Sequence, residues 1–134
     1  MSLIRNGFRV LFVLWAGSLW SLALWVAPTL FFAQGDRHLA GVLAARLFSV
    51  ETYLGLGVAA LAALLPGRNR MRWLYAAAGL LALNELVLRP LMESAHSRGT
   101  ALGLSFGAWH GVSAGLYVLA CLGAFLVVWN ENLR

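Results

Sequence analysis

Four long apolar stretches divide the chain, and short polar segments separate them. They cover about residues 10–32, 39–65, 71–89 and 102–129. Each reaches or approaches the roughly 20 residues that a helix needs to cross a hydrocarbon core about 30 Å thick. Lipid offers no hydrogen-bond partner to bare backbone, so each stretch must be a continuous helix. The pattern therefore predicts an all-α, single-domain, four-helix transmembrane bundle over residues 1–134.

Residues typical of helix ends and kinks lie at or near the boundaries of these stretches. Asp36 precedes the second stretch and is suited to cap its first turn, and Pro66-Gly67 is expected to end it. Pro28 lies near the end of the first stretch, where the missing N–H predicts a kink. Arg89-Pro90 is expected to end the third.

Composition supports the bilayer as the main solvent. Of 134 residues, 61% are hydrophobic and 11% are charged, whereas a soluble domain carries about 25% charged residues. The first apolar stretch exceeds the roughly 7–15 residues of a signal-peptide core. We therefore expect it to be retained as the first helix.

Charge predicts the orientation of the helices. The chain has ten arginines and no lysine against five acids, for a net charge of +5. If the chain crosses the membrane four times, six arginines lie on one side of it: Arg5, Arg9, Arg68, Arg70, Arg72 and Arg134. Three fall on the other side: Arg37, Arg89 and Arg98. Because positive residues concentrate in the cytoplasm, both termini are predicted to be cytoplasmic, in a bacterial inner membrane. The scatter of arginines predicts membrane lipids, and no nucleic acid, as partners.

Polar side chains inside the spans are the candidate functional residues. A charge at a helix centre costs about 2.5–3.5 kcal/mol on the insertion scale, so such groups should face the bundle and find partners. Because successive helices cross the bilayer in opposite directions, polar groups from three helices are expected in its outer half. The predicted polar pocket consists of Glu51, Asn84, Glu85, Arg89, His110, Ser113 and Tyr117.

The chemistry of this pocket allows several interpretations. Glu85 and Arg89 have the i,i+4 spacing, acid first, of a helix ion pair. Glu51 needs a donor, which His110 or Arg89 could supply, and intramembrane acids often mark ion or proton paths. His110 is either a hydrogen-bonded packing residue, a proton relay or substrate contact, or a haem or metal ligand. One histidine does not make a metal site, so the metal ligands are unknown and no catalytic residue or cofactor is predicted.

Glycines recur at every fourth position where the fourth stretch begins, at Gly103, Gly107, Gly111 and Gly115. Small residues let transmembrane helices approach closely. The stripe therefore predicts a helix-packing face, either for a neighbouring helix of the same chain or for a homo-oligomer through the fourth helix.

Four short motifs carry a family resemblance: APTLFF, AGVLAARLF, LNELVLRP and FGAWHGVS. With these motifs the chain resembles the membrane family called domain of unknown function 4149, to which transmembrane protein 205 belongs. The resemblance implies a four-helix integral membrane protein of unsettled role, and directs attention to Asn84, Pro90, His110 and Ser113. Tyr117 departs from the family pattern, which has asparagine seven residues after the histidine. More distantly, the chain looks like the copper-resistance-D group, which includes a haem-dependent protoporphyrinogen oxidase.

Three hypotheses for function follow. The first is a membrane protein, more plausibly not an enzyme, whose pocket binds or passes a small ligand, ion or proton. The second is a haem-binding oxidoreductase-like protein with His110 as axial ligand. The third is a non-catalytic subunit that oligomerises through its glycine face.

Overall fold

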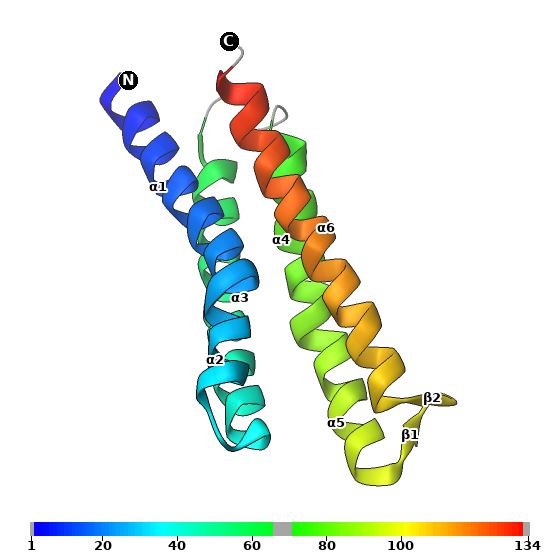
Figure 1. The fold of residues 1–134 in the computed structure, drawn as a ribbon. Coiled ribbons are helices and arrows are strands. Elements are labelled where there is room, and N and C mark those ends of the chain that lie inside the picture. The colour runs from blue at the N-terminus through cyan, green and yellow to red at the C-terminus, as the bar shows by residue number, and fades with distance from the viewer. Residues whose placement is uncertain (1, 66–70, 133–134) are drawn as a thin grey trace. The chain divides into compact units, whose positions relative to one another are not determined.

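The computed structural model describes residues 2–65 and 71–132 (Figure 1). In chain order its elements are α1 (Ser2–Ser21), η1 (Leu22–Val26), α2 (Ala27–Ala33), α3 (Arg37–Ala63), α4 (Arg72–Leu83), η3 (Asn84–Leu88), α5 (Arg89–Arg98), β1 (Thr100–Ala101), β2 (Leu104–Ser105) and α6 (Phe106–Asn132). The two η elements are π-helical turns within longer helices.

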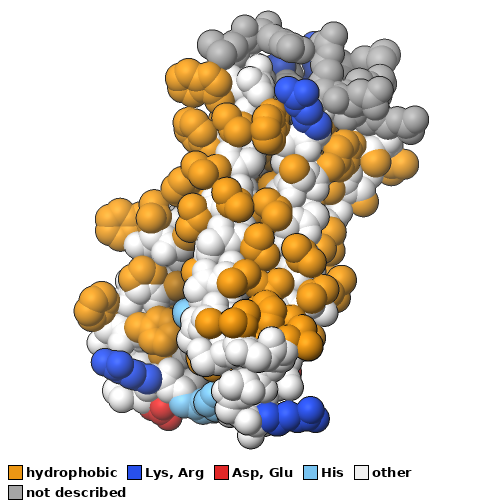
Figure 2. Space-filling model, turned by 90° about the vertical axis from the view of Figure 1, so that its right-hand side faces the viewer, with side chains coloured by type: hydrophobic (Ala, Val, Ile, Leu, Met, Phe, Trp, Pro, Cys, Tyr) orange, Lys and Arg blue, Asp and Glu red, His pale blue; other side chains and the backbone are white. Residues whose placement is uncertain are grey.

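The all-α, four-helix prediction is confirmed. Over the described residues, four helices are long and apolar enough to cross a membrane: Leu3–Ala33, Arg37–Ala63, Arg72–Arg98 and Phe106–Asn130. Figure 2 shows exposed hydrophobic side chains along the helices, with charged and histidine side chains near helix ends. This distribution is that of an integral membrane protein. The predicted stop at Pro66-Gly67 and three of the arginines used for orientation, Arg68, Arg70 and Arg134, lie outside the described residues.

The chain divides into two compact units, Met1–Arg68 and Asn69–Arg134. In the first unit, α1, η1 and α2 pack along α3. In the second, α4, η3 and α5 pack along α6. Each unit is therefore an antiparallel helix pair.

In the first unit, a tryptophan of α1 packs directly against a glycine of α3. The Trp15 indole on α1 lies against Gly55 of α3 so closely that a Cβ there would be 2.6 Å from Trp15 Cζ2. Trp15 is buried, as are Leu19 of α1 and Leu22, the first residue of η1. Glycine is required at this position because it leaves room for the ring.

The second unit uses small residues for close helix approach. A Cβ at Gly123 of α6 would be 3.3 Å from Ala77 Cβ and 3.4 Å from the Trp73 carbonyl oxygen of α4. Ala120 and Ala124, on the same face of α6, are fully buried. The closest approach of a glycine on α6 to α4 therefore falls at Gly123, outside the predicted stripe.

The predicted glycine stripe needs a correction at its first member. Gly103 is not helical: its φ of 80° places it in the turn between β1 and β2, and α6 begins three residues later at Phe106. Gly107, Gly111 and Gly115 do lie on α6. Within the second unit as described, no atom lies within 4 Å of a Cβ built at Gly111 or Gly115.

Both units place a π-turn just before a proline. The Ala27 N–H bonds to the Leu22 carbonyl and the Arg89 N–H bonds to the Asn84 carbonyl, five residues back in each case. Pro28 or Pro90 follows immediately. A proline removes a helix hydrogen bond and its ring crowds the carbonyl four residues earlier, and a wider π-turn lets the helix pass this point.

This local geometry corrects one predicted boundary. The third helix does not end at Arg89-Pro90 but continues as α5 to Arg98. The predicted cap of the second span is confirmed, because the Asp36 carboxylate accepts hydrogen bonds from the His38 and Leu39 N–H groups at 2.8 and 3.3 Å.

We predict that Gly55→Ala destabilises the protein by about 1–3 kcal/mol, as overpacking a close contact does. The added methyl group would force the Trp15 ring off α3. The measurement is the unfolding free energy in mild detergent. Gly57→Ala is the matched control, because it adds the same methyl group on α3 where no described atom lies within 4 Å. Equal stability of the two variants would contradict this account of the helix contact.

Candidate functional sites

Glu51 is the buried acid of the first unit. It lies near the middle of α3 (Arg37–Ala63), and its place in the outer half of the bilayer stays a prediction. Its exposed fraction is 8%. A charge costs most at a helix centre, so the partners of this side chain determine what it can do.

Those partners come from α1. The Ser18 hydroxyl lies 3.1 Å from Glu51 Oε2 and 2.8 Å from the Trp15 carbonyl oxygen. The Trp15 indole N–H donates to the Glu51 carbonyl at 3.2 Å. Trp15 therefore fixes the backbone of Glu51, while Ser18 contacts the carboxyl group itself.

The Ser18 hydroxyl has one proton, which gives this contact two forms. When that proton goes to Glu51 Oε2, it solvates an ionised carboxylate. When it goes to the Trp15 carbonyl, the Ser18 oxygen is free to accept a hydrogen bond from a protonated Glu51. Among the described residues no arginine or histidine pairs with Glu51, so its charge is not neutralised by a basic side chain there.

A groove opens beside this carboxyl group, entirely within the first unit. It has a volume of about 220 Å³. Ser18, Ser21 and Glu51 form its polar part, and its apolar walls are Leu22, Val26, Leu47 and Val50. Leu47 and Val50 are also exposed. The groove is thus mostly apolar, with one carboxyl group and two hydroxyl groups on its lining.

Asn84 and Ser113 form the polar centre of the second unit. The Ser113 hydroxyl donates to Asn84 Oδ1 at 2.6 Å, and Asn84 Nδ2 donates to the Ser113 carbonyl at 3.1 Å. Asn84 is the first residue of the π-turn η3, and Ser113 lies on α6. Two reciprocal bonds therefore join the third and fourth spans where the third is wound most loosely.

The predicted ion pair between Glu85 and Arg89 is confirmed, at 2.6 Å between Oε1 and Nη1. Arg89 also lies 3.4 Å from the exposed Glu93. The three side chains form one charged row along η3 and α5. The row leads from the centre of the Arg72–Arg98 span toward its C-terminal end.

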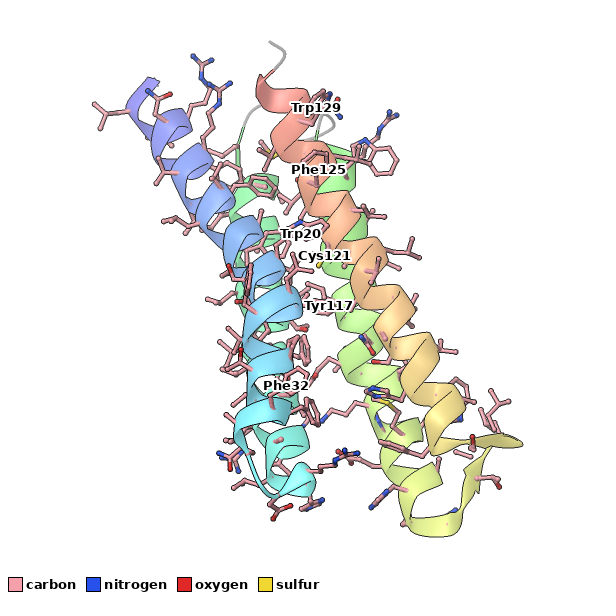
Figure 3. The ribbon with its side chains drawn as sticks, viewed as in Figure 1. Trp20, Phe32, Tyr117, Cys121, Phe125 and Trp129 are labelled. Carbon is pink, nitrogen blue, oxygen red and sulfur yellow. The ribbon has the colours of Figure 1, made fainter. Side chains whose placement is uncertain are left out.

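His110 and Tyr117 occupy different surroundings on α6. The His110 side chain is exposed and stacks on Phe106, with ring centroids 5.9 Å apart, and Phe106 also contacts His96 at 5.4 Å. Tyr117 is buried midway along α6, one turn before Cys121 (Figure 3). Among the described residues there is no group of three or more His, Cys, Asp or Glu side chains placed to hold a metal ion.

Within each unit, the structure brings some of the predicted pocket residues into contact. Asn84 meets Ser113 and Glu85 meets Arg89, both in the second unit. Glu51 meets Ser18 in the first unit, and its convergence with His110 stays a prediction. Sequence reasoning missed Trp15 and Ser18. The available signal was that Ser18 and Ser21 are the two hydroxyl residues in the middle of an otherwise apolar first span.

We predict that Asn84→Ala and Ser113→Ala are non-additive in unfolding free energy. Interhelical hydrogen bonds in membranes average about 0.6 kcal/mol and reach about 1.7 kcal/mol in double-mutant cycles. The two reciprocal bonds should give a coupling energy near the upper value. A double-mutant cycle measured in detergent micelles checks this. Fully additive effects would show that the two side chains do not stabilise each other.

Comparison with known protein families gives a match. The family described as Domain of unknown function (DUF4149) matches residues 10–101, which is most of the chain. No curated protein and no solved structure matches the chain. The matched range includes Trp15, Ser18, Glu51 and Asn84, and ends before α6.

Proposed function

Because the chain belongs to the DUF4149 family, which has no defined activity, we propose its function from the site: a non-enzymatic membrane protein that binds a small ligand or a proton at Glu51. The observation that supports this most is a buried carboxyl group on a groove, with one hydroxyl partner and no basic partner in the described residues. Intramembrane acids are functional candidates by default, because an ionised group there is expensive to keep.

The lining of the groove indicates a class of ligand. Leu22, Val26, Leu47 and Val50 accept an apolar tail, and Glu51 with Ser18 accepts hydrogen bonds from a polar head. A head with a positive charge would offset the cost of the ionised carboxylate in the apolar phase. The ligand is therefore a small amphiphile with a cationic or hydrogen-bond-donating head, or, in its simplest form, a proton.

The orientation belongs to the same proposal. We place both termini in the cytoplasm and the protein in a bacterial inner membrane, on the arginine distribution. The finer likeness to transmembrane protein 205 and the distant likeness to the copper-resistance-D group also stay proposals. Haem at His110 also stays a proposal, and the described contact of that ring is a stack on Phe106.

We predict that octylammonium stabilises the protein more than octanol does, because only the ammonium head can form an ion pair with Glu51. A ligand at 100 times its dissociation constant stabilises by about 2.7 kcal/mol. Thermal unfolding in a neutral detergent measures the effect, and octanoate serves as the anionic probe with the same tail. Glu51→Gln should reduce the octylammonium effect to that of octanol.

Glu93→Gln is the matched control for this experiment. It makes the same chemical change at an acid that is 72% exposed, so it should keep the full effect of octylammonium. If Glu51→Gln also keeps it, the Glu51 groove is not the binding site.

Oligomerisation through α6 is a second candidate function. Gly107, Gly111 and Gly115 lie on α6, and no described atom lies within 4 Å of a Cβ at Gly111 or Gly115. Close backbone approach at small residues is what drives helix association in lipid. A second copy of the same helix would fit such a face.

We predict that Gly111→Leu lowers the fraction of oligomer, because a bulky side chain keeps the two α6 helices apart. Sedimentation in a density-matched detergent measures this. Gly79→Leu on α4 is the control, because it adds the same bulk at another open glycine. An unchanged oligomer in Gly111→Leu, or a wild type that is monomeric in lipid nanodiscs, would exclude this interface.

A further inference from the structure

A two-residue turn connects β1 to β2 with an unexpected residue at its tip. Ala101 pairs with Leu104, so Leu102 and Gly103 are the turn residues. Their φ angles are 49° and 80°. A hairpin turn with two positive φ values favours Asn-Gly, and a leucine in this conformation costs free energy.

The same leucine is almost fully exposed. Its exposed fraction is 82%, and those of its neighbours Leu104 and Phe106 are 42% and 43%. Neither the backbone nor packing within the second unit accounts for leucine at this position. Residues held in unfavourable backbone conformations often have a functional reason, and here the reason must lie in what surrounds the side chain.

Two hydrogen bonds join the hairpin to the first turn of α6. The Trp109 indole N–H donates to the Ala101 carbonyl at 2.8 Å, and the Ser105 hydroxyl accepts from the Ala108 N–H at 3.3 Å. In Figure 1 the strands extend sideways from the adjoining ends of α5 and α6. The hairpin thus extends to the side of this helix pair and does not continue along either helix.

Position and charge indicate what the tip meets. The hairpin begins directly after Arg98, where one apolar span ends, and runs directly into Phe106, where the next begins. It therefore lies at the level of the lipid headgroups. Arg98, in the last turn of α5, is placed to attract headgroup phosphates, and Trp109 is of a type enriched at this level.

We propose that the β1–β2 hairpin is an interfacial anchor that inserts Leu102 among the lipid chains just below the headgroups. The bilayer is the occupant of this apolar tip. Transfer of the exposed leucine into the apolar phase offsets the backbone cost of its positive φ. The anchor fixes the height of α5 and α6 in the membrane, independently of any ligand at Glu51.

Site-directed spin labelling in liposomes tests this proposal. Cys121→Ser removes the single cysteine, and a nitroxide is attached to Leu102→Cys. Power saturation then compares the accessibility of the label to oxygen, which concentrates in lipid, with its accessibility to a water-soluble nickel chelate. We expect oxygen to exceed the chelate at this position.

Gly35→Cys is the matched control. Gly35 lies in the polar loop between α2 and α3, which the predicted topology puts on the same side of the membrane as the hairpin. No described atom lies within 4 Å of its Cβ position. Its label should favour the nickel chelate. A Leu102 label that behaves like the Gly35 label would show a solvated hairpin and overturn the proposal. A label shielded from both reagents would also overturn it, because protein would then cover the tip. Leu104→Cys repeats the measurement if the Leu102 variant does not fold.

Discussion

A polar group within an apolar span is costly unless it has a partner, and interhelical hydrogen bonds that meet this requirement are present in both helix pairs. In the first, Ser18 meets the Glu51 carboxyl group and the Trp15 indole meets the Glu51 carbonyl. In the second, Asn84 and Ser113 bond each other twice. Each contact needs two helices at short distance, which small residues permit. Gly55 beneath Trp15 and Gly123 against Ala77 are therefore part of the same solution.

The two units share a construction that the sequence does not make obvious. In each, a π-turn comes just before a proline in the first helix, so the span continues where an ordinary helix would break. The second unit places a polar partner, Asn84, in the π-turn itself. In the first unit, the π-turn contributes Leu22 and Val26 to the wall of the Glu51 groove. A distorted turn and a polar site are thus close together in both.

The four helices could be predicted because hydrophobic length alone determines them in lipid. The Asp36 cap and the Glu85–Arg89 pair followed from spacing along one helix. The continuation of the third helix past Pro90 could not, because it depends on the π-turn at Asn84. The Ser18 contact needed the rotation of α1 on α3, which the Trp15–Gly55 approach sets. The start of the fourth helix was misplaced because the Leu102-Gly103 turn has leucine where Asn is the usual signal.

We propose that the Glu51 carboxyl group is reached from the apolar phase through the groove beside it. Dicyclohexylcarbodiimide, which partitions into lipid, converts a protonated carboxyl group into a stable N-acylurea that peptide mass spectrometry locates. We expect this reagent to modify Glu51 in membranes, while a water-soluble carbodiimide modifies the exposed Glu93 and leaves Glu51 unchanged. A folded protein in which the apolar reagent leaves Glu51 unmodified, or in which the water-soluble reagent modifies Glu51 as fast as Glu93, would contradict the account.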